Sequence, residues 1–185
     1  MDEHEALTNQ NAKYALQLLS ENENTFREYT YAEQFDKLTQ NPSDYYGELI
    51  SIAGYLMEIT PLTEVFDANY NTTLYADGIR SILLINVEGL SNANNRSMLV
   101  FSTLTKEQLM LDGIYSISGL LAGTTMYKVT VHLQGQTETN FVKLPVLVAD
   151  EELIFPLSYE EYFFGYLGAY DDEEFVQRML EELYQ

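Results

Sequence analysis

The fold is decided by a six-residue segment that occurs twice, as SIAGYL at residues 51–56 and as SISGLL at residues 116–121. Each copy follows a turn glycine, Gly47 or Gly113. A glycine inside a long strand permits a bulge or a sharp bend, and a small closed sheet needs such bends in its longest strands. The repeat therefore predicts two long strands, bent at Gly54 and Gly119, within one closed sheet.

Around the two copies, apolar runs alternate with turn residues, which indicates further strands. The predicted strands are residues 47–59, 79–87, 98–101, 114–121 and 126–133, and residues 141–148 are a candidate sixth. Thr105 is expected to cap one or two helical turns over residues 105–111, and Ala122-Gly123-Thr124 is predicted to be a turn. We therefore expect residues 48–133 to close into one five-stranded cylinder.

The two ends of the chain predict helices. Apolar residues at positions 12, 15, 16 and 19 recur at helical spacing. A capping-box pattern at residues 30–33 starts a second helix, which Asn41-Pro42 ends. Residues 159–166 are aromatic and predicted helical, and the acidic run at 171–174 fits the first turn of a last helix. The expected divisions are an N-terminal helical segment (1–44), the closed sheet (45–149) and an acidic helical tail packed on it (150–185).

The composition describes an acidic protein with one core. The chain has 185 residues, 46% of them apolar, which is enough for a single packed interior. Its net charge is −20, and residues 150–185 alone hold 11 acidic residues and 1 basic residue. Such a surface repels nucleic-acid phosphates and anionic lipids. The charge therefore disfavours a nucleic-acid partner and fits a cationic partner, a metal ion or simple solubility better. Of the possible partners, we predict a protein with a basic surface.

The residue types exclude cysteine-based sites and a membrane span, but they leave the location of the protein open. The chain has no cysteine, so it forms no disulfide, zinc-thiolate site or catalytic thiol. No apolar run reaches the roughly 18 residues of a membrane span, so no transmembrane segment is expected. The acidic N-terminus does not resemble a signal peptide. A cytoplasmic protein and a mature secreted fragment with an added Met both remain open, as does the oligomeric state.

A resemblance to a known family rests on three short motifs. They are YAEQF at residues 31–35 followed by Asn41-Pro42, YYGELISIAG at residues 45–54, and LDGIYSISG at residues 111–119. Together with the order of three strands, a short helix and two strands, they resemble the tRNA-anticodon-domain-like OB-fold modules of bacterial lipoproteins and uncharacterised secreted proteins. The resemblance covers roughly residues 30–135.

The resemblance implies a mainly β fold, namely a five-stranded OB-like Greek-key barrel with flanking helices, and an extracytoplasmic location. It implies no activity, and no nucleic-acid-binding residues are carried over from it. The chain departs from these modules in its acidic tail, in an insertion at residues 60–73 and in lacking the cysteine to which a lipoprotein's lipid is attached. Membrane anchoring is therefore not supported by the resemblance.

Few residues suggest catalysis or metal binding. His132 alternates with apolar neighbours, and since a metal site needs several converging ligands, we expect it to face solvent; His4 lies near the chain end. The acidic runs at 160–161, 171–174 and 181–182 fit charged helix faces better than a calcium site or paired catalytic carboxylates. We therefore predict no catalytic, metal or cofactor site, and no enzyme.

The strongest functional signal is a cluster of six aromatic residues within residues 159–170. One helical stripe cannot bury all six, and Tyr is enriched at interfaces, although core packing remains an alternative. The predicted partner surface consists of Tyr159, Tyr162, Phe163, Tyr166, Tyr170, Asp171 and Asp172. The sequence thus predicts a non-enzymatic binding module with exposed loops at 60–73 and 88–97. The alternative is an acidic inhibitor that mimics nucleic acid.

Overall fold

The protein is mainly β. The computed structural model describes residues 15–20, 27–28, 41–61, 79–87, 97–133 and 136–162. Within these ranges the strands are β1 (Arg27–Glu28), β2 (Leu49–Pro61), β3 (Ser81–Asn86), β4 (Ser97–Ser102), β5 (Ile114–Leu133), β6 (Gln136–Ala149) and β7 (Ile154–Leu157). Short 3-10 helices are η2 (Pro42–Tyr45), η4 (Lys106–Gln108) and η5 (Glu151–Leu153), and residues 15–20 are α-helical.

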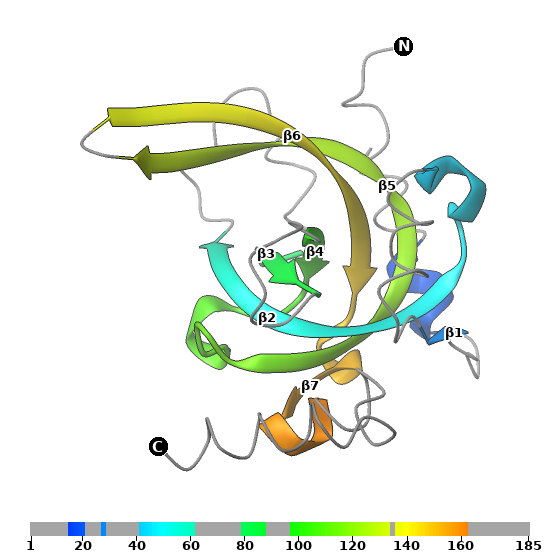
Figure 1. The fold of residues 1–185 in the computed structure, drawn as a ribbon. Helices are drawn as coiled ribbons and strands as arrows, with labels where there is room; N and C mark the ends of the chain where they lie inside the picture. The colour runs from blue at the N-terminus through cyan, green and yellow to red at the C-terminus, as the bar shows by residue number, and fades with distance from the viewer. Residues whose placement is uncertain are drawn as a thin grey trace, which may run out of the picture.

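Five of these strands close into a ring. The strand order is β1-β2-β3-β4-β6-β5-β7, and β2 also pairs with β5. The path β2-β3-β4-β6-β5 therefore returns to its start, as Figure 1 shows. β4 and β6 run parallel, and the other four pairs of the ring are antiparallel. β1 and β7 are short strands added to β2 and β5.

The long strand β5 corrects the predicted turn at Ala122-Gly123-Thr124. β5 runs without interruption for 20 residues and joins the two segments predicted as separate strands. The register between β5 and β6 shifts between Leu121 and Gly123, so the glycine is accommodated by an irregularity within the strand rather than by a turn. β6, the candidate sixth strand, therefore closes the ring. The closed sheet extends to Ala149 and does not end at residue 133.

The two copies of the repeated segment lie directly opposite each other. Ile52 of β2 pairs with Ile117 of β5, and next to them the Ser118 hydroxyl donates a 2.9 Å hydrogen bond to the Ser51 hydroxyl. β2 pairs with β5 up to Tyr55 and with β3 from Tyr55 onward. In the same way, β5 passes from β2 to β6 at Leu120. Each strand thus changes partner one residue after the glycine of its repeat.

Gly54 and Gly119 are required by the close approach of a neighbouring strand. A Cβ at Gly54 would collide with the carbonyl oxygen of Asn86, and a Cβ at Gly119 would collide with that of Val148. Both glycines are buried. At both positions the absence of a side chain lets a third backbone pack against the β2–β5 pair, which explains why the repeat retains a glycine there.

Apolar side chains cover both sides of the sheet. A first cluster has members on all five strands of the ring and therefore fills its interior: Ile50, Ile52, Leu56, Leu83, Ile85, Met98, Val100, Ile117, Leu121 and Leu147. A second cluster lies on the outer side and joins Ala15 of the short helix to Leu99, Phe101, Leu144, Val146 and Val148. β4 is therefore buried on both faces, as its unbroken apolar sequence indicates.

The chain ends are described only in part. Residues 15–20 are helical, within the range expected from spacing, while the helices predicted near residues 30–38 and 171–183 lie outside the described residues. Pro42 starts η2 after Asn41, and β7 and η5 were not predicted. Among the described residues, no helix has the length and apolar character needed to cross a bilayer.

Candidate functional site

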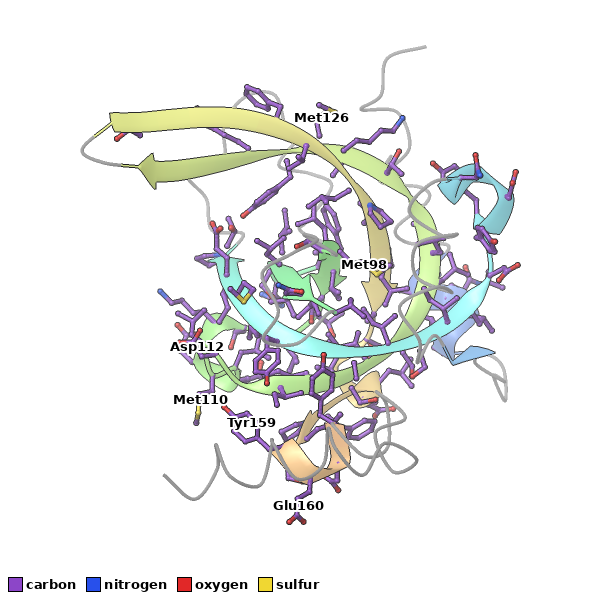
Figure 2. The ribbon with its side chains drawn as sticks, in the orientation of Figure 1. Met98, Met110, Asp112, Met126, Tyr159 and Glu160 are labelled. Atoms are coloured by element: carbon purple, nitrogen blue, oxygen red, sulfur yellow. The ribbon has the colours of Figure 1, made fainter. Side chains whose placement is uncertain are left out.

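A groove of about 480 Å³ lies on the outer face of β3 and β4. We call it the outer groove. Its lining residues are Glu58 and Thr60 of β2, Ile82 of β3, Leu99 and Phe101 of β4, Thr125, Met126, Tyr127 and Lys128 of β5, and Phe141 of β6. Figure 2 labels Met126 near the point where β5 and β6 leave the ring. The volume is typical of sites that bind a small molecule or a few side chains of a partner.

The outer groove follows from the alternation of side chains along β3 and β4. Successive residues of a strand point to opposite sides of the sheet, so Leu83, Met98 and Val100 fill the ring interior. Their neighbours Ile82, Leu99 and Phe101 then face outward into the groove. The floor of the groove is therefore apolar because these two strands are apolar on both sides.

One side of the outer groove is formed by a two-stranded hairpin. From Met126 paired with Lys143 to Leu133 paired with Gln136, β5 and β6 pair only with each other among the described residues. The hairpin extends beyond the ring, as Figure 1 shows. The side chain of Phe141 is 63% exposed and its residue pairs with Lys128. The hairpin thus brings an aromatic ring and an ammonium group to the groove.

A hydrogen bond crosses the outer groove. The Tyr127 hydroxyl of β5 donates to the carboxylate of Glu58 on β2. Burial, this hydrogen bond and the negative charge of Glu58 together raise the pKa of Tyr127 above its ordinary value. The hydroxyl is therefore a neutral donor throughout the physiological range. The carboxylate retains acceptor capacity for a further donor.

The predicted aromatic surface is divided by the structure. Tyr162 is fully buried, and its hydroxyl donates a 3.0 Å hydrogen bond to the Val87 carbonyl. Its ring packs edge-on against Tyr55 at 5.4 Å between ring centroids. Tyr162 therefore belongs to the interior and not to the exposed partner surface for which it was proposed. A buried Tyr needs both an apolar contact and an acceptor, and Tyr162 has the two.

Tyr159 remains 46% exposed, with its ring centroid 6.4 Å from that of Tyr55. The other predicted surface residues, Phe163, Tyr166, Tyr170, Asp171 and Asp172, lie outside the described residues. The predicted loops lie largely outside them as well. His132 lies in β5 and pairs with Thr137, and its side chain is not among those described. Within the described ranges, no three His, Cys, Asp or Glu side chains gather as a metal site would require.

The outer groove was not predicted from the sequence. Its lining comes from five strands, so no local pattern contains it. The one available signal was Glu58, a carboxylate in an otherwise apolar strand. The register of β2 against β3 shifts between Leu56 and Glu58, which places two successive residues, Met57 and Glu58, in exposed positions.

Comparison with known proteins does not assign this chain to a family. No protein-family model matches it, and no curated protein matches it either.

Proposed function

We propose that this chain is a non-enzymatic OB-fold binding module that holds a segment of a protein partner in its outer groove. Support for the fold comes from the closed circuit β2-β3-β4-β6-β5 and from η4, which lies between the third and fourth strands of the ring. The kinship with the OB modules of bacterial lipoproteins is part of the same proposal.

The observation that carries the function is the position of the outer groove. OB folds bind ligands on the face of their second and third strands, beside the loops that join strands one to two and four to five. Counted around the ring in chain order, β3 and β4 are the second and third strands. They supply Ile82, Leu99 and Phe101, and the hairpin between the fourth and fifth strands supplies Phe141.

A protein segment fits this groove better than a nucleic acid does. Binding a phosphate backbone requires a basic surface, whereas the groove has one lysine, Lys128, and one carboxylate, Glu58, in an apolar lining. The chain as a whole has a net charge of −20. An extended peptide with a bulky apolar residue for the groove and a Lys or Arg for Glu58 satisfies both features.

A peptide selection tests this function. Short random peptides are selected on the purified protein, and the affinity of the selected peptides is then measured for Phe141→Ser and Glu58→Gln. Each variant is expected to weaken binding about tenfold, since loss of an apolar anchor or of a charge-assisted hydrogen bond is worth roughly 1.4 kcal/mol. Glu152→Gln, an exposed carboxylate of η5, is the matched control and is expected to bind normally.

The proposal fails if selected peptides bind Phe141→Ser and the unchanged protein equally well. It also fails if a fluorescent single-stranded oligonucleotide binds at low salt and the peptides do not. In that case the aromatic side chains of the groove would be stacking on bases.

A further inference from the structure

We propose that a second surface, separate from the outer groove, docks a basic amphipathic helix of a partner protein. Four large apolar side chains form this surface, which we call the methionine patch. They are Met57, Met110, Leu111 and Tyr159, exposed by 50%, 72%, 49% and 46% respectively. A gathering of exposed apolar side chains commonly marks an interaction site. This inference does not depend on the function proposed for the groove.

Backbone hydrogen bonds hold the parts of the methionine patch together. The amide of Asp112 donates to the carbonyl of Leu56, and the amide of Leu56 donates to the carbonyl of Gly113, both at 2.9 Å. The turn at residues 110–113 therefore lies against β2 beside Met57. Figure 2 shows Met110, Asp112 and Tyr159 at the same corner of the molecule.

Tyr159 reaches the same surface through Tyr55. Leu56 points into the ring interior, so its neighbours Tyr55 and Met57 lie on the outer side of β2. The ring of Tyr159 covers Tyr55 at 6.4 Å between centroids. Met57 therefore lies on the same side of β2 as Tyr55, two residues further along the strand, and is close to the Tyr159 ring that covers Tyr55.

The turn that carries Met110 and Leu111 is fixed before any partner binds. The Met110 amide donates a 2.8 Å hydrogen bond to the Tyr115 hydroxyl, and the Gly113 amide donates a 3.2 Å bond to the Met110 carbonyl. Asp112 has a φ of 60°, which closes the turn. A preformed surface loses less conformational entropy on binding, while the flexible thioether of methionine adapts to different apolar side chains.

The charge around the methionine patch selects a basic partner. Asp112 within the turn and Glu160 next to Tyr159 are both exposed. They stand on a chain whose overall charge is −20, which attracts cationic segments over a distance. A helix with Leu-like residues on one face and Lys or Arg beside them complements an apolar patch bordered by carboxylates.

The test uses a fluorescent helical peptide of Leu and Lys, in which the two residue types lie on opposite faces. The control peptide has the same composition in an order that does not separate them. Fluorescence anisotropy with the full chain is expected to show binding of the first peptide and at least tenfold weaker binding of the second. The double variant Met110→Ser/Leu111→Ser is expected to weaken the first peptide at least tenfold, and circular dichroism checks that it is folded.

Three further variants separate the effect of local charge from that of overall charge, and the methionine patch from the outer groove. Asp112→Asn tolerates the positive φ and is expected to weaken the peptide severalfold. Asp44→Asn, an exposed carboxylate in η2 at the other end of β2, is expected to have no effect. Phe141→Ser in the outer groove is also expected to leave the affinity unchanged.

The inference is overturned if the control peptide binds as tightly, or if the double variant binds normally. It is also overturned if Phe141→Ser is the variant that weakens binding, because the peptide would then occupy the groove. Self-association that is abolished by the double variant, in place of peptide binding, would identify a second copy of the chain as the occupant and would overturn it too.

Discussion

Tyr127 and Glu58 are hydrogen-bonded although they lie on β5 and β2, which stand at opposite ends of the path β2-β3-β4-β6-β5. Over residues 49–55 the two strands pair directly, but beyond that pair they separate and β3 and β4 lie between them on the groove side. The hydrogen bond therefore joins the two sides of the outer groove above an apolar floor.

Removal of this hydrogen bond is expected to reduce stability modestly. Tyr127→Phe should lower the free energy of unfolding by about 1 kcal/mol, the usual value for one hydrogen bond. Urea denaturation of Tyr127→Phe, Glu58→Gln and the double variant gives the coupling between the two side chains. Strictly additive single effects would show that the two residues do not stabilise each other.

Alkaline pH is expected to destabilise the protein through its buried tyrosines. Burial, with a smaller contribution from Tyr159, raises the pKa of Tyr55 from 10.0 to about 12, and the pKa of Tyr127 is raised as well. Between about pH 10 and 12 the unfolded chain has released these protons and the folded chain has not. The free energy of unfolding therefore falls as pH rises through this window.

Tyr55→Phe provides the control for this pH dependence. At neutral pH the change is expected to be neutral or slightly stabilising, because it removes a buried hydroxyl with no partner among the described residues. In urea titrations above pH 10 the variant is expected to lose less stability than the unchanged protein. Identical pH profiles would contradict the assignment of this loss to Tyr55.

Substitution of Gly54 or Gly119 by alanine is expected to be severely destabilising. Gly54→Ala and Gly119→Ala each place a methyl group against a backbone carbonyl, which should cost about 3 kcal/mol. The matched control is Gly47→Ala. Gly47 has a φ of 85°, but no atom lies near the position of an added Cβ. The only cost expected there is that of holding alanine in a left-handed backbone conformation, about 1–2 kcal/mol. Equal losses at all three sites in thermal denaturation would refute the close-approach explanation.

Residues 159–162 form a short helical turn, and this turn is expected to depend on its cap. Glu161 accepts hydrogen bonds from the Ser158 amide at 2.8 Å and from its hydroxyl at 3.0 Å, and the Glu161 amide donates to that hydroxyl at 3.2 Å. Ser158→Ala should cost about 1 kcal/mol, measured in urea. The hydrogen bonds from the Ser158 amide and hydroxyl lower the pKa of Glu161. The stability that this cap contributes is therefore present above the ordinary pKa of a carboxyl group, and it is lost as the pH falls through the lowered pKa of Glu161. A Ser158→Ala variant as stable as the unchanged protein would show that the cap is dispensable.

The strands were predictable because they are marked by local chemistry. Residues 47–59 and 79–87 differ from the observed β2 and β3 by one or two residues at each end, since apolar runs and turn glycines are local signals. The turn at Gly123 was wrong because a glycine in a strand irregularity and a glycine in a turn have the same local sequence. Only the pairing of β5 with β6 distinguishes them.

The candidate site was not predictable for a related reason. The neighbours of Tyr162 in the sequence fit a surface or a core equally well. It is buried against Tyr55 and Ile114, and its hydroxyl donates to Val87, which is 75 residues away in the chain. The outer groove depends on side chains from five strands at once. Long-range pairing decides both features, and no spacing in the sequence encodes it.

The alternation along β4 also separates two kinds of selection pressure. Met98 and Val100 belong to the interior of the ring, whereas Leu99 and Phe101, between and beside them, form the floor of the groove. Leu99 and Phe101 are also buried in the second apolar cluster, at 2% and 3% exposure. A substitution at either position therefore alters the groove and the outer packing together and leaves the ring interior intact. Altered recognition is expected from exchanges between apolar side chains of different shape, not from polar ones.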